Sequence, residues 1–395
     1  MKIISLKNTQ PGAIVARPIY DETMRLLANK GVVLNRALIT KLEERGHKYI
    51  YIQAEGTEGI IIEDTIPIEI SKRISNEVGE TLKKITNLSK KEKDAVNQSV
   101  DKLGIRGKFN NLSQNGSFRI NIARFVNALI HLKRPVISSF ALSMLGANPV
   151  SHAMDVSLLS IMLGQKLNYS QKDLQLLAAA SFMHDCGIQM TPDIVEKPCY
   201  QLSSEEVEIF KEHPRLGSNL LDYLNYFTPV EIQSVLQHHE NQDGSGFPSE
   251  LKGVDIKNDL DKKVGKAHIF RMAEVIAVAD RYVKYCAGEF SEIPKTPAEA
   301  INLLLQESGT ILNAAVVAQF GKIINIFPKG AVVKVKDSDE TSIIGYEGVV
   351  SKENYKNMEK PVIVLLRSKE NKKISPLIVD LSSDVKGRID LLFLL

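Results

Sequence analysis

Apolar residues follow two different periods along this chain, and the changes between them divide it into segments. From residue 1 to about residue 64, short apolar runs alternate with turn residues. Such runs predict strands, here at 13–15, 31–34 and 49–52. The spacing over 36–45 predicts one helix that ends at Gly46. We interpret residues 1–66 as a small α+β module with a regulatory role.

The pattern becomes helical and polar from residue 68 to about residue 103, with few aromatic residues. A stretch rich in Gly, Asn and Ser follows and indicates a boundary. We therefore expect a helical linker over 67–117. Helical periodicity then dominates from residue 118 to about residue 320.

Strand-like runs return after Pro328 and are bounded by Gly, Asp, Asn and Ser. They lie at 331–335, 348–350, 361–366 and 377–379. The fold class we expect is therefore multidomain. An all-α helical core over 118–327 is flanked by the N-terminal α+β module and by a small C-terminal β domain over 328–395.

Composition narrows the class of protein. A hydrophobic content of 44% with 25% charged residues is typical of a soluble globular chain. A net charge of +3 gives no strong electrostatic case for a nucleic acid polymer or an anionic membrane. No apolar run is long enough to span a bilayer, and the N-terminus breaks at Pro11-Gly12 before a signal-like core develops. The cysteines Cys186, Cys199 and Cys286 form no C-x-x-C pair, which favours a reducing cytoplasm. We expect a cytoplasmic protein without membrane insertion.

Histidine is scarce, at eight residues in 395, yet five of the eight lie between residues 151 and 240. His184-Asp185 directly follows an apolar helical stretch, and Asp280 ends the apolar run 275–279. An ionised carboxylate beside an apolar core needs a cation or strong hydrogen-bond donors. Asp280 alone has an equally good explanation in a salt bridge with Arg281.

The other four histidines of this region also have ordinary explanations. His238-His239 ends a helix that begins near Pro229, and adjacent residues of a helix point about 100° apart, so both rings can reach one cluster. A solvated surface also explains this pair, and a polar helix end explains His213 or His152. Taken together, imidazoles and carboxylates from several segments are what a polynuclear metal site requires. An enzyme is therefore the first hypothesis.

The motifs also follow a known order. They are H-D-x-G at 184–187, H-P at 213–214, H-H-E-x-x-D-G-x-G-F-P at 238–248 and A-D at 279–280. In order and spacing this set resembles the HD-GYP family, the branch of HD-domain metal phosphohydrolases that hydrolyses cyclic di-GMP. The resemblance covers about residues 118–320, and the joint motif set is far more specific than the H-D dipeptide alone.

The resemblance implies a helical bundle that holds two metal ions. His152, His184, Asp185 and Asp280 would hold one ion, and Asp185 would bridge to a second bound by His213, His238 and His239. Asp185 and His184 would be the catalytic residues. Two divalent transition-metal ions are implied, iron or manganese first, with zinc, cobalt and nickel as alternatives. The substrate-binding loop would comprise Asp243, Gly244, Gly246, Phe247 and Pro248.

The implied function is a metal-dependent phosphodiesterase in bacterial second-messenger signalling. It would cleave cyclic di-GMP to pGpG or GMP through a hydroxide that bridges the two metals. The implied partners are the cyclic dinucleotide substrate, a diguanylate cyclase (GGDEF) or another signalling protein, and a second copy of the chain in a homodimer.

This chain departs from the family pattern at the groups that would bind phosphate. Ile188 stands where the family carries a lysine, and Phe247 replaces the tyrosine of G-Y-P. Asn148 stands where members with a third metal carry glutamate, which favours two metals. The segment after Asp280 also lacks the arginine that contacts nucleotide phosphate. The candidates to replace these charges are the following residues: Arg281, Lys284, Lys262, Lys263 and Lys266.

Two other functions stay open at this point. The domain can be a catalytically weak or inactive module that binds metal or nucleotide for signalling. It can also be a phosphohydrolase that acts on a different nucleotide. Binding without turnover would separate the first alternative from an active enzyme, and a substrate panel would separate the second.

Overall fold

The structure, a computed structural model, divides into two compact units. It describes residues 1–21, 25–62, 66–98, 104–132, 137–138, 148–191, 197–254, 268–354 and 356–392. The first unit comprises the described parts of 1–65, 136–151 and 324–395, and the second those of 66–135 and 152–323. Lys262, Lys263 and Lys266 lie outside the described residues.

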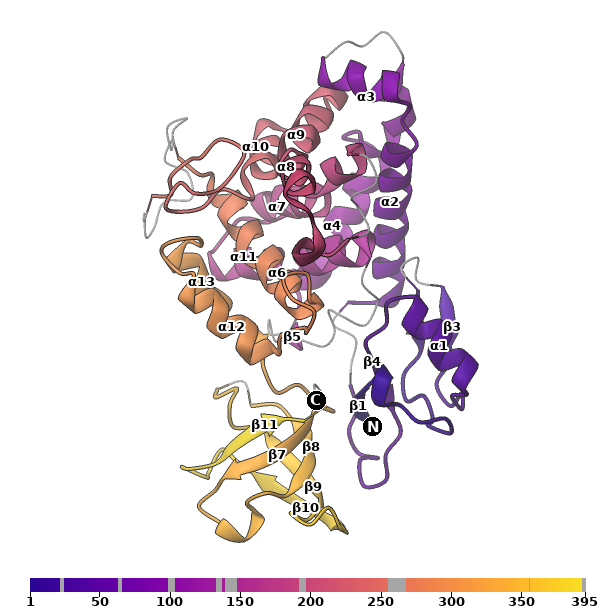
Figure 1. The fold of residues 1–395 in the computed structure, drawn as a ribbon, viewed down its shortest axis with the longest axis vertical. Helices are drawn as coiled ribbons and strands as arrows, with labels where there is room; N and C mark the ends of the chain where they lie inside the picture. Colours follow the sequence, from indigo (N-terminus) through magenta and orange to yellow (C-terminus); the bar gives the residue numbers. More distant parts are fainter. Residues whose placement is uncertain are drawn as a thin grey trace. The chain divides into compact units, whose positions relative to one another are not determined.

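The second unit is helical (Figure 1). Its α-helices are α2 (Ile68–Thr86), α3 (Lys90–Asn97), α4 (Ser117–Ile130), α6 (Pro149–Lys166), α7 (Gln171–Met183), α8 (Ser204–Lys211), α9 (His213–Leu224), α10 (Pro229–Gln237), α11 (Arg271–Ala287), α12 (Pro297–Gln306) and α13 (Ala314–Phe320). Short 3₁₀ turns lie between them at η2 (Ile105–Leu112), η4 (Cys186–Met190) and η5 (Cys199–Gln201). The predicted all-α core is confirmed.

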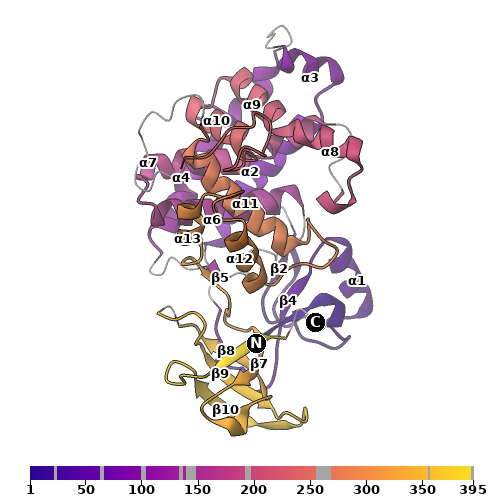
Figure 2. The same ribbon diagram turned by 60° about the vertical axis from the view of Figure 1, so that its left-hand side comes forward.

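Helix α10 lies at the centre of the packing that concerns the site. It packs against α7, α9 and α11, while η4 packs on α9 and on α2 (Figures 1 and 2). The sequence sets its start: Thr228 and Glu231 form a capping box, with Pro229 in the first turn. An aromatic group of Phe118, Phe125 and Phe182 with edge-to-face contacts fills the space between α4 and α7.

A buried ion pair links α4 to α10. Both guanidinium ends of Arg119 bind the carboxylate of Glu231, and Nη2 also donates to the carbonyl of Tyr226 at 2.8 Å. Glu231 is 0% exposed and Arg119 14% exposed. Removing one partner of a buried pair leaves an uncompensated charge.

We expect Arg119→Leu to lower the free energy of unfolding by about 3–5 kcal/mol, because Glu231 would remain buried without its cation. Urea denaturation followed by circular dichroism measures the change. Arg124→Leu is the matched control, since Arg124 is exposed on the same helix and its loss should change stability by at most about 0.5 kcal/mol. Equal effects of the two substitutions would contradict the prediction.

The first unit contains the strands. Its five-stranded antiparallel sheet has the order β10-β9-β8-β7-β11. The strands are β7 (Val332–Asp337), β8 (Glu347–Lys352), β9 (Val362–Arg367), β10 (Lys373–Asp380) and β11 (Arg388–Leu391), with the turn η6 (Thr341–Ile343) between β7 and β8. A short parallel pair joins β5 (Ile137–Ser138) to β6 (Ile324–Asn325).

The N-terminal residues of this unit form a second set of elements. They are β1 (Lys2–Ser5), η1 (Leu6–Asn8), β2 (Ile19–Tyr20), β3 (Leu26–Ala28), α1 (Arg36–Glu44) and β4 (Tyr49–Ile52). β1 pairs with β4, and Ile3 and Tyr51 share one hydrophobic core with Val333, Val350 and Leu365 of the sheet. The two terminal segments therefore bury their apolar faces together. The four-part division drawn from the sequence stays a prediction.

Among the described helices, none combines the length and the apolar composition that crossing a membrane requires.

Candidate metal centre

Seven residues predicted from the sequence as metal ligands come together in the helical unit. Most of them lie at helix ends, where a side chain can leave the helix axis and face a common centre. His152 and Asp280 lie within α6 and α11. His213 begins α9, His184 follows the last residue of α7, and His238 follows that of α10. Asp185 and His239 are the next residues along the chain.

The first group comprises His152, His184, Asp185 and Asp280, whose ligand atoms all lie within 4.8 Å of one another. His152 Nε2 lies 2.9 Å from Asp280 Oδ1 and 3.3 Å from Asp185 Oδ2. His184 Nε2 lies 3.2 Å from Asp185 Oδ2 and 3.2 Å from His152 Nε2. Two nitrogens and two carboxylates therefore face one point.

The second group comprises Asp185, His213, His238 and His239, again within 4.8 Å. Here the other carboxylate oxygen is used: Asp185 Oδ1 lies 3.1 Å from His213 Nε2 and 3.4 Å from His238 Nε2. The two oxygens of Asp185 thus face different groups, which is the arrangement of a bridging carboxylate.

Three of the histidines are oriented by the same kind of hydrogen bond to a backbone carbonyl. Nδ1 of His184, His213 and His238 lies 2.7 Å from the carbonyl oxygen three residues earlier, at Ser181, Phe210 and Val235. An Nδ1–H that donates to a carbonyl leaves the Nε2 lone pair free to bind a metal, and this second contact fixes the ring. Each local helix end therefore aims Nε2 at the centre.

Three polar atoms at this centre lack hydrogen-bond partners. Within the described residues, Asp185 Oδ1, Asp280 Oδ1 and His239 Nε2 are buried and have no hydrogen-bond partner of acceptable geometry. Buried polar atoms without partners are costly, and a bound cation would satisfy these three. His152 Nε2 and His184 Nε2 face each other at 3.2 Å, as do His213 Nε2 and His238 Nε2 at 3.3 Å. The residues fit two divalent metal ions with nitrogen and oxygen ligation.

The charge states of His238, His239 and Asp280 agree with that fit, whereas the carboxylates of Asp185 and Asp280 outweigh burial and raise the pKa of His152 and His184. Burial lowers the pKa of His238 to about 4 and holds the pKa of His239 well below its usual range, so both are neutral at pH 7. Neutral imidazole is the form that ligates metals. Burial raises the pKa of Asp280, but Lys284 and the neighbouring histidines outweigh burial and hold that pKa well below its usual range. The carboxylate is therefore ionised.

The predicted substrate loop is only partly at the centre. Phe247 stacks on the His239 ring at 4.7 Å and lines the adjacent cavity. Asp243 is exposed, and its carboxylate accepts hydrogen bonds from Ser245 of its own loop. Gly246 is required by packing, because a Cβ there would lie 2.3 Å from the amide nitrogen of Asn241. Gly244 and Pro248 do not line the cavity.

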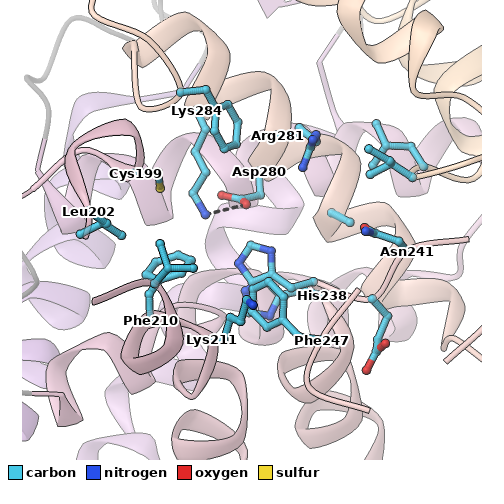
Figure 3. Close-up of a pocket in the computed structure, with 17 residues that line it drawn as sticks. Cys199, Leu202, Phe210, Lys211, His238, Asn241, Phe247, Asp280, Arg281 and Lys284 are labelled. Atoms are coloured by element: carbon cyan, nitrogen blue, oxygen red, sulfur yellow. Dashed lines mark hydrogen bonds and ion pairs between the residues drawn. The ribbon is translucent and has the colours of Figure 1, made fainter. Parts of the chain in front are cut away.

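A cavity of about 220 Å³ opens onto His238, His239 and Asp280 (Figure 3). The sequence does not predict most of its walls, because they come from segments far apart along the chain. These residues include Cys199, Phe210, Asn241, Phe290 and Ile311. The place of Phe210 near the site could have been predicted from the sequence, because it lies three residues before His213. Its carbonyl oxygen orients the His213 ring.

Asn148, which stands where family members with a third metal carry glutamate, has a structural role at the start of α6. Asn148 Oδ1 accepts from the amide of Ser151 at 2.9 Å, and its Nδ2 donates to the Ser151 hydroxyl at 2.9 Å. Asn148 thus binds the first turn of α6. This favours two ions over three.

Comparison with known proteins agrees with the geometry. Residues 129–316 match the family model of the HD domain. This chain has an HD domain. The resemblance inferred from His184-Asp185 and the later motifs is confirmed. The HD domain contains all seven candidate ligands within its matched range.

Relatives of this HD domain carry names from cyclic dinucleotide chemistry. A cyclic di-GMP phosphodiesterase response regulator of Xanthomonas campestris is 32% identical over 120 residues, which is 30% of this chain and 28% of that protein. A cyclic di-GMP phosphodiesterase of Pseudomonas aeruginosa is 26% identical over 263 residues, or 66% of this chain and 56% of that protein. A 3′3′-cGAMP-specific phosphodiesterase of Vibrio cholerae is 31% identical over 108 residues, or 27% of this chain and 20% of that protein. This chain thus spans less than two thirds of each relative.

Proposed function

We propose that the HD domain of this chain is a divalent-metal-dependent phosphodiesterase that hydrolyses a cyclic dinucleotide. The observation that carries this proposal is the pair of ligand groups that share Asp185 beside a cavity. A pair of divalent ions supplies an activated water at neutral pH and stabilises charge on the phosphoryl oxygens. The two groups use opposite oxygens of one carboxylate, which suits ions close enough to act on one phosphate.

Cyclic di-GMP is the first substrate that we propose, with pGpG or GMP as the product. The names of the Xanthomonas and Pseudomonas relatives support it. The rings of Phe210, Phe247 and Phe290 line the cavity and offer flat apolar surfaces for a base. His152, His184, Asp185 and Asp280 would hold one ion, and His213, His238 and His239 would hold the other with Asp185. Iron and manganese come first, with zinc, cobalt and nickel as alternatives.

The test is turnover by protein loaded with manganese, or with iron under anaerobic conditions. We expect cleavage of cyclic di-GMP in an assay that separates pGpG from GMP by chromatography, and loss of cleavage after chelation. Protein with two bound ions that leaves every cyclic dinucleotide intact would overturn the proposal.

A second cyclic dinucleotide is a specific alternative for the same chemistry. The Vibrio relative is named for 3′3′-cGAMP, and this chain carries Ile188 and Phe247 where the motif family carries lysine and tyrosine. The same assay with 3′3′-cGAMP, linear dinucleotides and nucleoside monophosphates decides between substrates by their kcat/KM ratios.

A binding module without turnover is the other candidate. The pairing of Arg281 favours this candidate. Its guanidinium donates to Glu307 at 2.6 and 2.7 Å, so this candidate replacement for the family's phosphate-contacting arginine is engaged within the protein. Calorimetric binding of cyclic di-GMP by metal-loaded protein that shows no cleavage would establish it. The cytoplasmic location, a diguanylate-cyclase partner and a homodimer stay predictions.

A further inference from the structure

Lys284 lies beside the candidate metal centre and is the feature from which we draw a further inference. It follows Asp280 by one turn of α11, so both side chains leave the same face of the helix. The residue is only 5% exposed. Its Nζ donates to Asp280 Oδ2 at 2.8 Å and lies 3.9 Å from Asp185 Oδ2 (Figure 3). A lysine ammonium is thus held next to both carboxylates of the first ligand group.

Two carboxylates face the Lys284 ammonium, one in hydrogen-bond contact and one farther away. An ammonium has three N–H donors, and the described residues accept one of them, at Asp280. The contact of 3.9 Å to Asp185 is beyond hydrogen-bond range. Donors therefore remain for an oxygen that enters the cavity, whose wall includes Lys284.

The geometry separates two roles for Asp280. Oδ2 is bound by Lys284, while Oδ1 faces His152 Nε2 at 2.9 Å. The ammonium therefore does not occupy the position between the histidines and the carboxylates. It lies to the side, where the cavity meets the centre (Figure 3).

The other cationic side chains near the cavity are less suited than Lys284 to bind an oxygen that enters it. Arg281, the next residue after Asp280, gives its guanidinium to Glu307 and lies over the Phe290 ring. Lys211 is more exposed, at 42%, and pairs with Glu208. Among the described lysines and arginines, Lys284 alone forms an ion pair with Asp185 or Asp280.

We propose that the Lys284 ammonium binds a non-bridging oxygen of the substrate phosphate, next to the metal pair. This deepens the proposed function and rests on it for the identity of the substrate. A lysine is a compact point charge that suits phosphate. Its position lets one residue hold Asp280 by one N–H and the phosphate by another.

The test uses inorganic phosphate as the probe, so that it does not depend on which dinucleotide is cleaved. Manganese-loaded protein is titrated with phosphate by calorimetry. We expect Lys284→Met to bind phosphate about 10- to 100-fold more weakly, the worth of a hydrogen bond to a charged group. The variant should still contain two metal ions by elemental analysis. In turnover assays we expect KM to rise. If the contact between Lys284 and the phosphate is stronger in the transition state than in the bound substrate, kcat will also fall.

Two further variants separate binding from structure. Lys284→Gln keeps an N–H donor for Asp280 and loses the charge, so it should retain metal and lose phosphate affinity. Lys322→Met is the matched control, because Lys322 is an exposed lysine that bonds only to Gln319 among the described residues.

The outcomes are distinct. Unchanged phosphate affinity in Lys284→Met would overturn the inference, and so would loss of metal from both Lys284 variants, which would make the residue a positioning group for Asp280. Weaker phosphate binding in a protein that cleaves no cyclic dinucleotide would support this inference while the proposed function fails.

Discussion

Asp185→Ala is expected to lose both metal ions together and at least about a thousandfold of kcat, because each oxygen of this carboxylate faces a different ligand group. Removing it takes one ligand from each group at once and also removes the negative charge that offsets several imidazoles. Elemental analysis of the purified protein measures the metal, and hydrolysis of the accepted substrate measures the activity.

Single-group variants make this prediction sharper. Asp280→Ala should lower occupancy only in the group with His152 and His184, whereas His239→Ala should lower it only in the group with His213 and His238. Asp222→Ala is the matched control, since Asp222 is an exposed carboxylate on α9. Full metal content in folded Asp185→Ala would contradict the prediction that Asp185 bridges the two ligand groups.

The ligand set could be predicted from the sequence because its residue types and spacings are themselves the signal. His184-Asp185 and His238-His239 each follow a helix whose apolar pattern is visible, and the fold needs only to bring the helix ends together. Helix α1 and strand β4 were likewise predicted, at 36–45 and 49–52, because Gly46 and the apolar runs are local signals. Strand β11 was missed, since Arg388–Leu391 is a short edge strand of mixed polarity.

Contacts between distant segments were beyond sequence reasoning. The partner of Arg281 is Glu307, 26 residues away, and only the fold shows that this pairing engages the Arg281 guanidinium within the protein. The core shared by Ile3 and Val333 joins opposite ends of the chain. Lys284 is the intermediate case: its spacing of four from Asp280 was visible, but its burial beside Asp185 was not.

Gly187→Ala is expected to disrupt the second ligand group without replacing any of its ligand side chains. A Cβ at this position would lie 1.9 Å from the carbonyl oxygen of His213 and 2.5 Å from the amide nitrogen of Gly217. Both are backbone atoms of α9, so no side-chain rotation can relieve the clash. Either η4 or α9 must move, and α9 begins with His213. The close approach of these two backbones is the physical reason for a glycine after His184-Asp185.

We therefore expect Gly187→Ala to cost about 1–3 kcal/mol of stability or more and to lower occupancy of the ion held by His213, His238 and His239. Thermal unfolding and elemental analysis measure the two effects. Gly321→Ala is the matched control, since a Cβ there meets nothing within 4 Å. Selective loss of one ion, with the group of His152 and Asp280 still loaded, would show that the packing of η4 on α9 sets the second group alone. A Gly187→Ala protein with normal stability and two ions would mean that the two backbones do not approach this closely.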